Sequence, residues 1–151
     1  MLQMKSLSVG ELSTCCYIVW DDASDACVVI DPGAEPERIR KACEGRRIEA
    51  ILLTPNMMCD HVSCMVTDPL FKQVAEKCAK RQNEGTLDLY VNTAKEIAAK
   101  HGAAICDCYT KWKTMNANGV NTTRLLANYI NHPTREMNKL FATSLLETMM
   151  N

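Results

Sequence analysis

The apolar pattern of the chain changes at Ile51-Leu52-Leu53-Thr54, and this change constrains the fold more than any other feature. Residues before it form short β-rich runs, and most residues after it form amphipathic helical stretches. The run 48–54 has the apolar character of a buried parallel strand. A strand shared by a strand-rich half and a helix-rich half predicts an α/β fold with one sheet.

The first half is expected to contain a three-stranded meander followed by a helix. A helix is predicted over 35–44, because Pro36 suits a first helical turn and Gly45 suits a C-terminal cap. Turn-forming residues separate the three preceding β-rich runs. Those runs cover 4–9, 15–20 and 26–30.

The second half is expected to be mostly helical, with one short apolar strand at 103–109. A right-handed crossover would place strand 48–54 parallel to 26–30, with 103–109 on its other side. The prediction is therefore one domain over 1–151, in βββαβ-αα-β-αα order. Its single mixed sheet has an N-terminal antiparallel meander, then parallel strands, and is covered by helices. The helical segments are 68–82, 87–100, 111–118 (one turn), 122–129 and 133–150.

Composition excludes several classes of protein. The formal net charge is -1 and no basic stripe is present, which argues against a nucleic-acid surface. No apolar run approaches the roughly 18 residues of a membrane span, and the N-terminus lacks the pattern of a signal peptide. We therefore expect a cytoplasmic protein without membrane partners.

Nine cysteines are unusual for a chain of 151 residues. Their odd number, the chain length and the lack of a secretion signal argue against a disulfide framework. Most lie in apolar segments, where a free thiol behaves as a small core side chain. We expect them to be reduced.

Residues 1–54 resemble the start of the metallo-β-lactamase fold, in its glyoxalase II-like hydrolase branch. The resemblance rests on Thr14-Cys15-Cys16-Tyr17-Ile18-Val19-Trp20, on Val28-Val29-Ile30-Asp31-Pro32-Gly33-Ala34, on the helix 36–45 and on Ile51-Leu52-Leu53-Thr54. It implies that this part of the chain contributes three strands and a helix.

The metal-binding motif of that family is missing. The family continues with H-x-H-x-D-H, whose imidazoles and carboxylate hold two metal ions that activate a water. Here the stretch is Pro55-Asn56-Met57-Met58-Cys59-Asp60-His61, without the two leading histidines. Asp60-His61 is shifted by one position, and we interpret it as a coincidence.

Residues 51–151 resemble the C-terminal part of an SGNH/GDSL-type esterase. The resemblance rests on the strand and loop 51–58, the helix 87–100, the strand 104–109 and Asn128-Tyr129-Ile130-Asn131-His132-Pro133-Thr134-Arg135. In the family, a His-Pro pair at this point opens the last helix and the His is the general base. The resemblance therefore implies that His132 is a candidate catalytic base.

The rest of that family's machinery has no counterpart. The Gly-Asp-Ser nucleophile block and the two blocks that supply oxyanion donors would precede residue 51, and they are absent. The acid expected three residues before His132 is replaced by Tyr129. A base without a nucleophile has little to activate. Asn56, at the end of a strand, is a secondary candidate for substrate binding.

A cluster of thiols and an imidazole in the loop after residue 54 is a secondary candidate for a metal site. Cys59, His61 and Cys64 offer the right ligand types, but closed zinc sites need four ligands. We expect no metal and no other cofactor.

Three functional hypotheses follow. The first is an SGNH/GDSL-type ester hydrolase remnant that is largely inactive and takes a small ester substrate. The second is a metallo-β-lactamase-fold hydrolase remnant without its metal motif. The third is a non-enzymatic fused or recombined fold. Because each half has lost the strands that would cover it, we also expect homo-oligomers through an exposed sheet edge.

Overall fold

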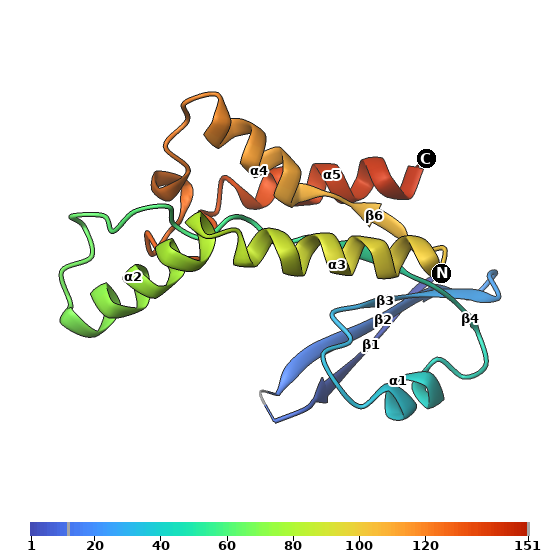
Figure 1. Ribbon diagram of the computed structural model, residues 1–151. Coiled ribbons are helices and arrows are strands. Elements are labelled where there is room, and N and C mark those ends of the chain that lie inside the picture. The colour runs from blue at the N-terminus through green and yellow to red at the C-terminus, as the bar shows by residue number, and fades with distance from the viewer. Residues whose placement is uncertain (12, 151) are drawn as a thin grey trace. The chain divides into compact units, whose positions relative to one another are not determined.

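The computed structural model describes residues 1–11 and 13–150 and confirms the α/β class. The chain divides into two compact units, Met1–Ala50 and Ile51–Asn151, which are described separately (Figure 1). Among the described residues, every helix is too short or too polar to cross a membrane.

The first unit is a four-stranded mixed sheet with one helix. Its strands are β1 (Leu2–Val9), β2 (Thr14–Asp21), β3 (Ala26–Ile30) and β4 (Arg47–Glu49), in that spatial order. The β1–β2 and β2–β3 pairs are antiparallel, as the predicted meander requires. Helix α1 (Pro36–Ala42) then carries the chain to β4, which pairs parallel with β3.

Alternation along the strands builds the small core of this unit. Cys16 and Ile18 of β2 point to the same face because side chains two apart in a strand do so. On α1, Ile39 and the capping Cys43 are four residues apart and meet that face. The buried residues of the core are Val9, Cys16, Ile18, Cys27, Ile39 and Cys43.

A turn and a helix are tied together in the same unit. The Glu35 carboxylate accepts a hydrogen bond from the Gly10 backbone N–H at 2.8 Å. Gly10 has φ +70°, and a Cβ there would lie 2.8 Å from Cβ of Ala34. Only glycine fits this close approach without displacing the chain.

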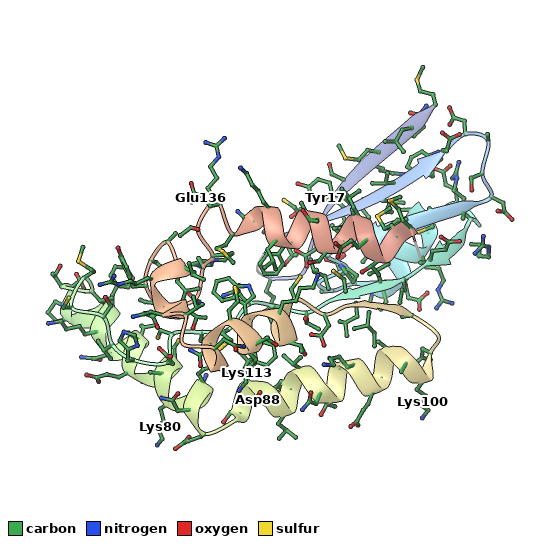
Figure 2. The ribbon with its side chains drawn as sticks, turned by 90° about the horizontal axis from the view of Figure 1, so that it is seen from above. Tyr17, Lys80, Asp88, Lys100, Lys113 and Glu136 are labelled. Carbon is green, nitrogen blue, oxygen red and sulfur yellow. The ribbon has the colours of Figure 1, made fainter. Side chains whose placement is uncertain are left out.

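The second unit combines a two-stranded parallel sheet with helices. The sheet pairs β5 (Ile51–Leu53) with β6 (Ala104–Cys106), and both α3 and α5 pack against β6. Figure 2 shows Lys113 and Asp88 pointing toward each other, and their ion pair of 3.0 Å joins α4 to α3. The helices are α2 (Pro69–Asn83), α3 (Thr86–Lys100), α4 (Cys108–Ala117), the 3-10 helix η1 (Thr122–Leu125) and α5 (Asn138–Met150).

The core of the second unit is larger and lies around Trp112, which is fully buried. The indole N–H of Trp112 has no hydrogen-bond partner among the described residues. An unpartnered buried donor costs roughly 1–3 kcal/mol of stability. Apolar packing around the Trp112 ring therefore has to offset this cost. The buried residues are Met57, Cys59, Val66, Ala75, Ala79, Val91, Tyr109, Trp112, Leu126 and Ile130.

The predicted strand 48–54 is divided, and this changes the sheet. It forms β4 and β5, which are separated at Ala50 and belong to two different sheets. The charged residues Arg47 and Glu49 flank Ile48 and suit an exposed edge strand, whereas Ile51-Leu52-Leu53 is apolar throughout. The expected single sheet is therefore two sheets.

Two predicted elements in the second unit also have different limits. The strand expected at 103–109 ends at Cys106, because the Asp107 side chain accepts from the Thr110 N–H and caps α4. The helix expected from residue 133 begins at Asn138. The preceding chain is held in a loop by a hydrogen bond from the Ala127 N–H to the His132 carbonyl at 2.7 Å.

Candidate functional site

The two residues predicted for an esterase-type site lie on neighbouring segments. Asn56 follows β5, and its Nδ2 donates to the Asn131 carbonyl at 2.9 Å and to the Met57 carbonyl at 2.7 Å. Asn131 directly precedes His132 in sequence. The side chain of Asn56 therefore fixes the backbone beside the candidate base.

A single side chain organises the loop that carries His132. Asn128 Oδ1 accepts from the backbone N–H groups of Ile130, Asn131 and His132 at 3.0, 3.0 and 3.1 Å. Such local bonds are the reason that Asn favours turns over helices. They explain why the helix predicted over 122–129 stops at Leu125. The His132 side chain is exposed on this loop.

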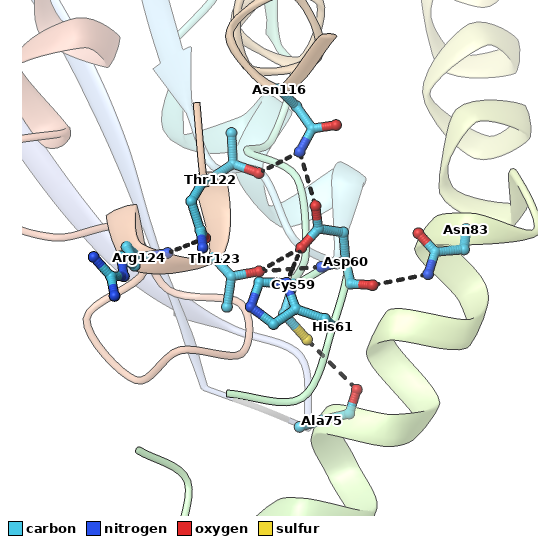
Figure 3. A network of polar contacts seen from close by, with 10 residues as sticks. Cys59, Asp60, His61, Ala75, Asn83, Asn116, Thr122, Thr123 and Arg124 are labelled. Carbon is cyan, nitrogen blue, oxygen red and sulfur yellow. Dashed lines mark hydrogen bonds and ion pairs between the residues drawn. The ribbon is translucent and has the colours of Figure 1, made fainter. Parts of the chain in front are cut away.

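The best-connected polar group of the second unit is the Asp60–His61 pair (Figure 3). His61 Nδ1 lies 2.6 Å from Asp60 Oδ1. Asp60 Oδ1 also accepts from Thr123 Oγ1 at 2.7 Å, and its Oδ2 accepts from Asn116 Nδ2 at 2.8 Å. A carboxylate held from three directions can fix the orientation of an imidazole ring.

These hydrogen bonds also determine the charge of Asp60. Burial by itself would raise the pKa of this carboxyl. Hydrogen bonds from Thr123, Asn116 and His61 outweigh burial, and the pKa lies below its ordinary value. Asp60 therefore stays ionised at neutral pH and presents a negative charge to the ring of His61.

The secondary metal candidates are not gathered into a metal site. Cys59 is fully buried, and its Sγ lies 3.5 Å from the Ala75 carbonyl. Burial raises the pKa of Cys59 to about 11, so it is a thiol rather than a metal-binding thiolate. Cys64 is exposed. Throughout residues 1–11 and 13–150, no three His, Cys, Asp or Glu side chains are placed to hold a metal ion.

A second charged cluster lies after β6 and has a structural role. Asp107 Oδ2 lies 2.5 Å from Lys95 Nζ, and its Oδ1 accepts from Thr54 Oγ1 at 3.1 Å. Burial would raise the pKa of Asp107, but bonds from Lys95, Thr110 and Thr54 lower it to about 2. The cluster caps α4 and joins it to α3 and to the end of β5.

An apolar pocket of about 360 Å³ lies between the loop after Cys64 and the loop before His132. Asp68 lines it but is already used, since its carboxylate caps α2 through the Leu70 and Phe71 N–H groups. The lining residues are Met65, Val66, Thr67, Asp68, Phe71, Asn128, Tyr129 and Ile130.

The sequence does not predict the hydrogen-bond partners of the Asp60 carboxylate. Nothing in the spacing of Asp60-His61 indicates that Asn116 and Thr123 contact the carboxylate. The dipeptide Asp60-His61 in a polar loop was the available signal. Asn116 and Thr123 lie more than fifty residues further along the chain, so only folding brings them to Asp60.

No protein family matches the chain, and no solved structure matches it. The chain is similar to an uncharacterized protein of Aquifex aeolicus (strain VF5), with 36% identity over 59 residues, which is 39% of this chain. The match spans 28% of the length of that relative.

Proposed function

We propose that residues 51–151 contain the general base of an SGNH-type ester hydrolase site. The supporting observation is the hydrogen bond of 2.9 Å from Asn56 to the Asn131 carbonyl. It joins the end of a parallel strand to the loop of His132, and open α/β sheets place their sites at such strand ends. The substrate would be a small ester.

The chemistry available to His132 is limited. An imidazole can take a proton from an attacking water and return it to the leaving alcohol. A serine nucleophile and its oxyanion donors would add far more, and the sequence blocks that supply them in the family are missing here. We therefore propose weak hydrolysis, without metal, cofactor, nucleic acid or membrane, in the cytoplasm.

The test is hydrolysis of p-nitrophenyl butyrate by the purified chain and by its His132→Ala variant. We expect the variant to lose about half or more of the hydrolysis rate that exceeds the buffer background. This loss is far smaller than the roughly 10²-fold rate increase that general-base catalysis can supply. His101→Ala is the matched control, because His101 is also exposed and follows α3. Equal rates for all three proteins would overturn the proposal.

Two alternatives remain, and each has a simple test. A metallo-β-lactamase-type remnant would require bound metal, so elemental analysis without zinc or iron would end it. A non-enzymatic fold would hydrolyse the ester no faster than a mixture containing the same concentration of free imidazole.

A further inference from the structure

His61 differs from the other two histidines in what holds its ring. Within the described residues, it is the only histidine whose ring nitrogen meets a carboxylate, at 2.6 Å from Asp60. The His61 side chain is 50% exposed, so the ring is accessible from solvent. A base oriented through Nδ1 leaves Nε2 available for proton transfer.

The carboxylate that orients His61 is itself rigidly held. Its partner Thr123 is fully buried, and the Asp60 backbone N–H also donates to Thr123 Oγ1 at 3.2 Å. Asn83 of α2 donates to the Asp60 carbonyl at 2.8 Å. Side chains from α2, α4 and η1 thus converge on Asp60, which gives the pair the supporting contacts that a precise catalytic geometry needs (Figure 3).

The chain next to this pair contacts a residue that lines the apolar pocket. The Cys59 N–H donates to the Ile130 carbonyl at 2.7 Å, and Ile130 lines the pocket. Met65, four residues after His61, also lines the pocket. The only charged lining residue, Asp68, is an anion, so the pocket disfavours an anionic occupant such as a free fatty acid.

We infer that Asp60 and His61 form a general-base pair that hydrolyses neutral acyl esters whose apolar acyl group occupies this pocket. A volume of about 360 Å³ is at the lower end of ligand pockets, which span roughly 300–1,000 Å³, and suits a short or medium acyl chain. The inference goes beyond the proposed function, because it holds whether or not His132 contributes.

The hydrolysis consumes only water and needs no further reagent. His61 Nε2 removes a proton from water as the water oxygen bonds to the ester carbonyl carbon. The tetrahedral intermediate then breaks its bond to the alcohol oxygen, and the imidazolium returns the proton to that oxygen. The products are the carboxylic acid and the alcohol. Asp60 is a positioning residue that stabilises the imidazolium.

The test uses the His132→Ala chain as background, so that the two candidate bases are separated. Adding His61→Ala is expected to lower the remaining rate on p-nitrophenyl butyrate about tenfold, below the usual range for general bases because oxyanion donors are lacking. Adding His101→Ala instead is expected to leave it unchanged. Circular dichroism would confirm that the variants are folded.

Two further variants separate a catalytic role of the pair from a structural one. Asp60→Asn, which keeps the shape of the side chain, is expected to lower kcat with little change in KM. It should also remove the low-field proton NMR signal of an Nδ1–H bonded to a carboxylate. Phe71 lies on the exposed rim of the pocket. Phe71→Ala should therefore raise the KM for p-nitrophenyl octanoate several-fold more than the KM for p-nitrophenyl acetate.

An unchanged rate after His61→Ala in the His132→Ala background would overturn the inference while leaving the proposed function intact. If instead His61→Ala abolishes that rate while His132→Ala alone has no effect, the proposed function fails and the inference stands. A Phe71→Ala effect that is independent of chain length would overturn the assignment of the pocket.

Discussion

The two units of this protein are built from different kinds of interaction. Met1–Ala50 has a core of six buried residues, three of them cysteines, and its strands are joined mainly by backbone pairing. Ile51–Asn151 has a larger core around Trp112 and side-chain polar networks on Asp60 and Asp107. The first unit is organised by its strand ladder, and the second depends on side chains that converge at loops.

This difference indicates where chemistry is possible. Buried or half-buried carboxylates with several hydrogen-bond partners cost desolvation energy, and proteins place many of their functional groups in such settings. In the part of the chain that the structure describes, both carboxyls with three or more side-chain or backbone donors lie in the second unit.

The sharpest test of the comparison is to damage each core separately. Ile18→Ala in the first unit and Leu126→Ala in the second should each cost about 2–5 kcal/mol, because both side chains are almost completely buried. Each unit holds one tryptophan, Trp20 or Trp112, so fluorescence of single-tryptophan variants reports each unit separately. We expect each substitution to shift only the unfolding curve of its own unit.

The loss of stability should have the larger effect on the first unit. A unit of about fifty residues buries a small fraction of its surface and is marginally stable. Ile18→Ala should therefore leave the Trp20 environment unfolded at room temperature, while Trp112 stays native. Identical unfolding curves from both tryptophans would show that the two units unfold together and would break the comparison.

The next effect concerns the Asp107 cluster. The pKa of Asp107 is about 2 in the folded chain, below the ordinary value of 3.8 for this carboxyl, and its side chain is mostly shielded. This difference corresponds to about 2 kcal/mol of stability for the second unit. Asp107→Asn keeps a helix-capping side chain but removes the charge, so the loss measured by urea unfolding at pH 7 isolates the charge.

The same cluster predicts a pH dependence. The folded pKa is depressed, so its stabilisation is complete above about pH 4 and is lost as pH falls toward 2. The free energy of unfolding followed by Trp112 should decrease over that window in the wild type. In Asp107→Asn this part of the decrease should be missing, and an unchanged slope would contradict the assignment.

Much of the fold could be predicted because it depends on local sequence patterns. The alternation in β2, the Pro36 and Gly45 signals of α1 and the Asp68-Pro69 start of α2 each act within a few residues. The break at Ala50 could not be predicted, because residues 48–54 together have the length of a single strand. Which sheet each side joins depends on tertiary pairing.

The candidate site was predictable only in part. The resemblance to SGNH/GDSL-type esterases predicts His132, and its loop lies beside Asn56, the secondary candidate. The Asp60 network was missed because two of its donors come from α4 and η1, far along the chain. Sequence spacing identifies ligands on one helix or strand, but it does not show which distant loops meet.

Self-association is the third expected effect and concerns the edges of the sheets. Strand β1 is an edge of the first sheet, and its Met4 side chain is 67% exposed. Unpaired edges with apolar side chains favour pairing between chains. Met4→Lys should weaken dimerisation about tenfold, or about 1.4 kcal/mol, in analytical ultracentrifugation. A wild-type chain that stays monomeric at high concentration would contradict this prediction.

The smallest effect belongs to the first unit. The guanidinium of Arg46 lies 4.7 Å from the centre of the Trp20 ring. Such a cation–π contact contributes about 0.5–1 kcal/mol when partly exposed. Arg46→Gln should lower the stability of the first unit by that amount, measured by urea unfolding, whereas Arg40→Gln on the exposed part of α1 should change it little.

Because each unit contains buried cysteines, thiol labelling can measure the unfolding of each unit separately. Each unit has one exposed cysteine, Cys15 or Cys64, that a maleimide can reach in the native protein. Each also has three buried cysteines, which react only when that unit unfolds. They are Cys16, Cys27 and Cys43 in the first unit, and Cys59, Cys106 and Cys108 in the second. Peptide mass spectrometry after timed labelling would therefore give two separate opening rates from one unmodified chain.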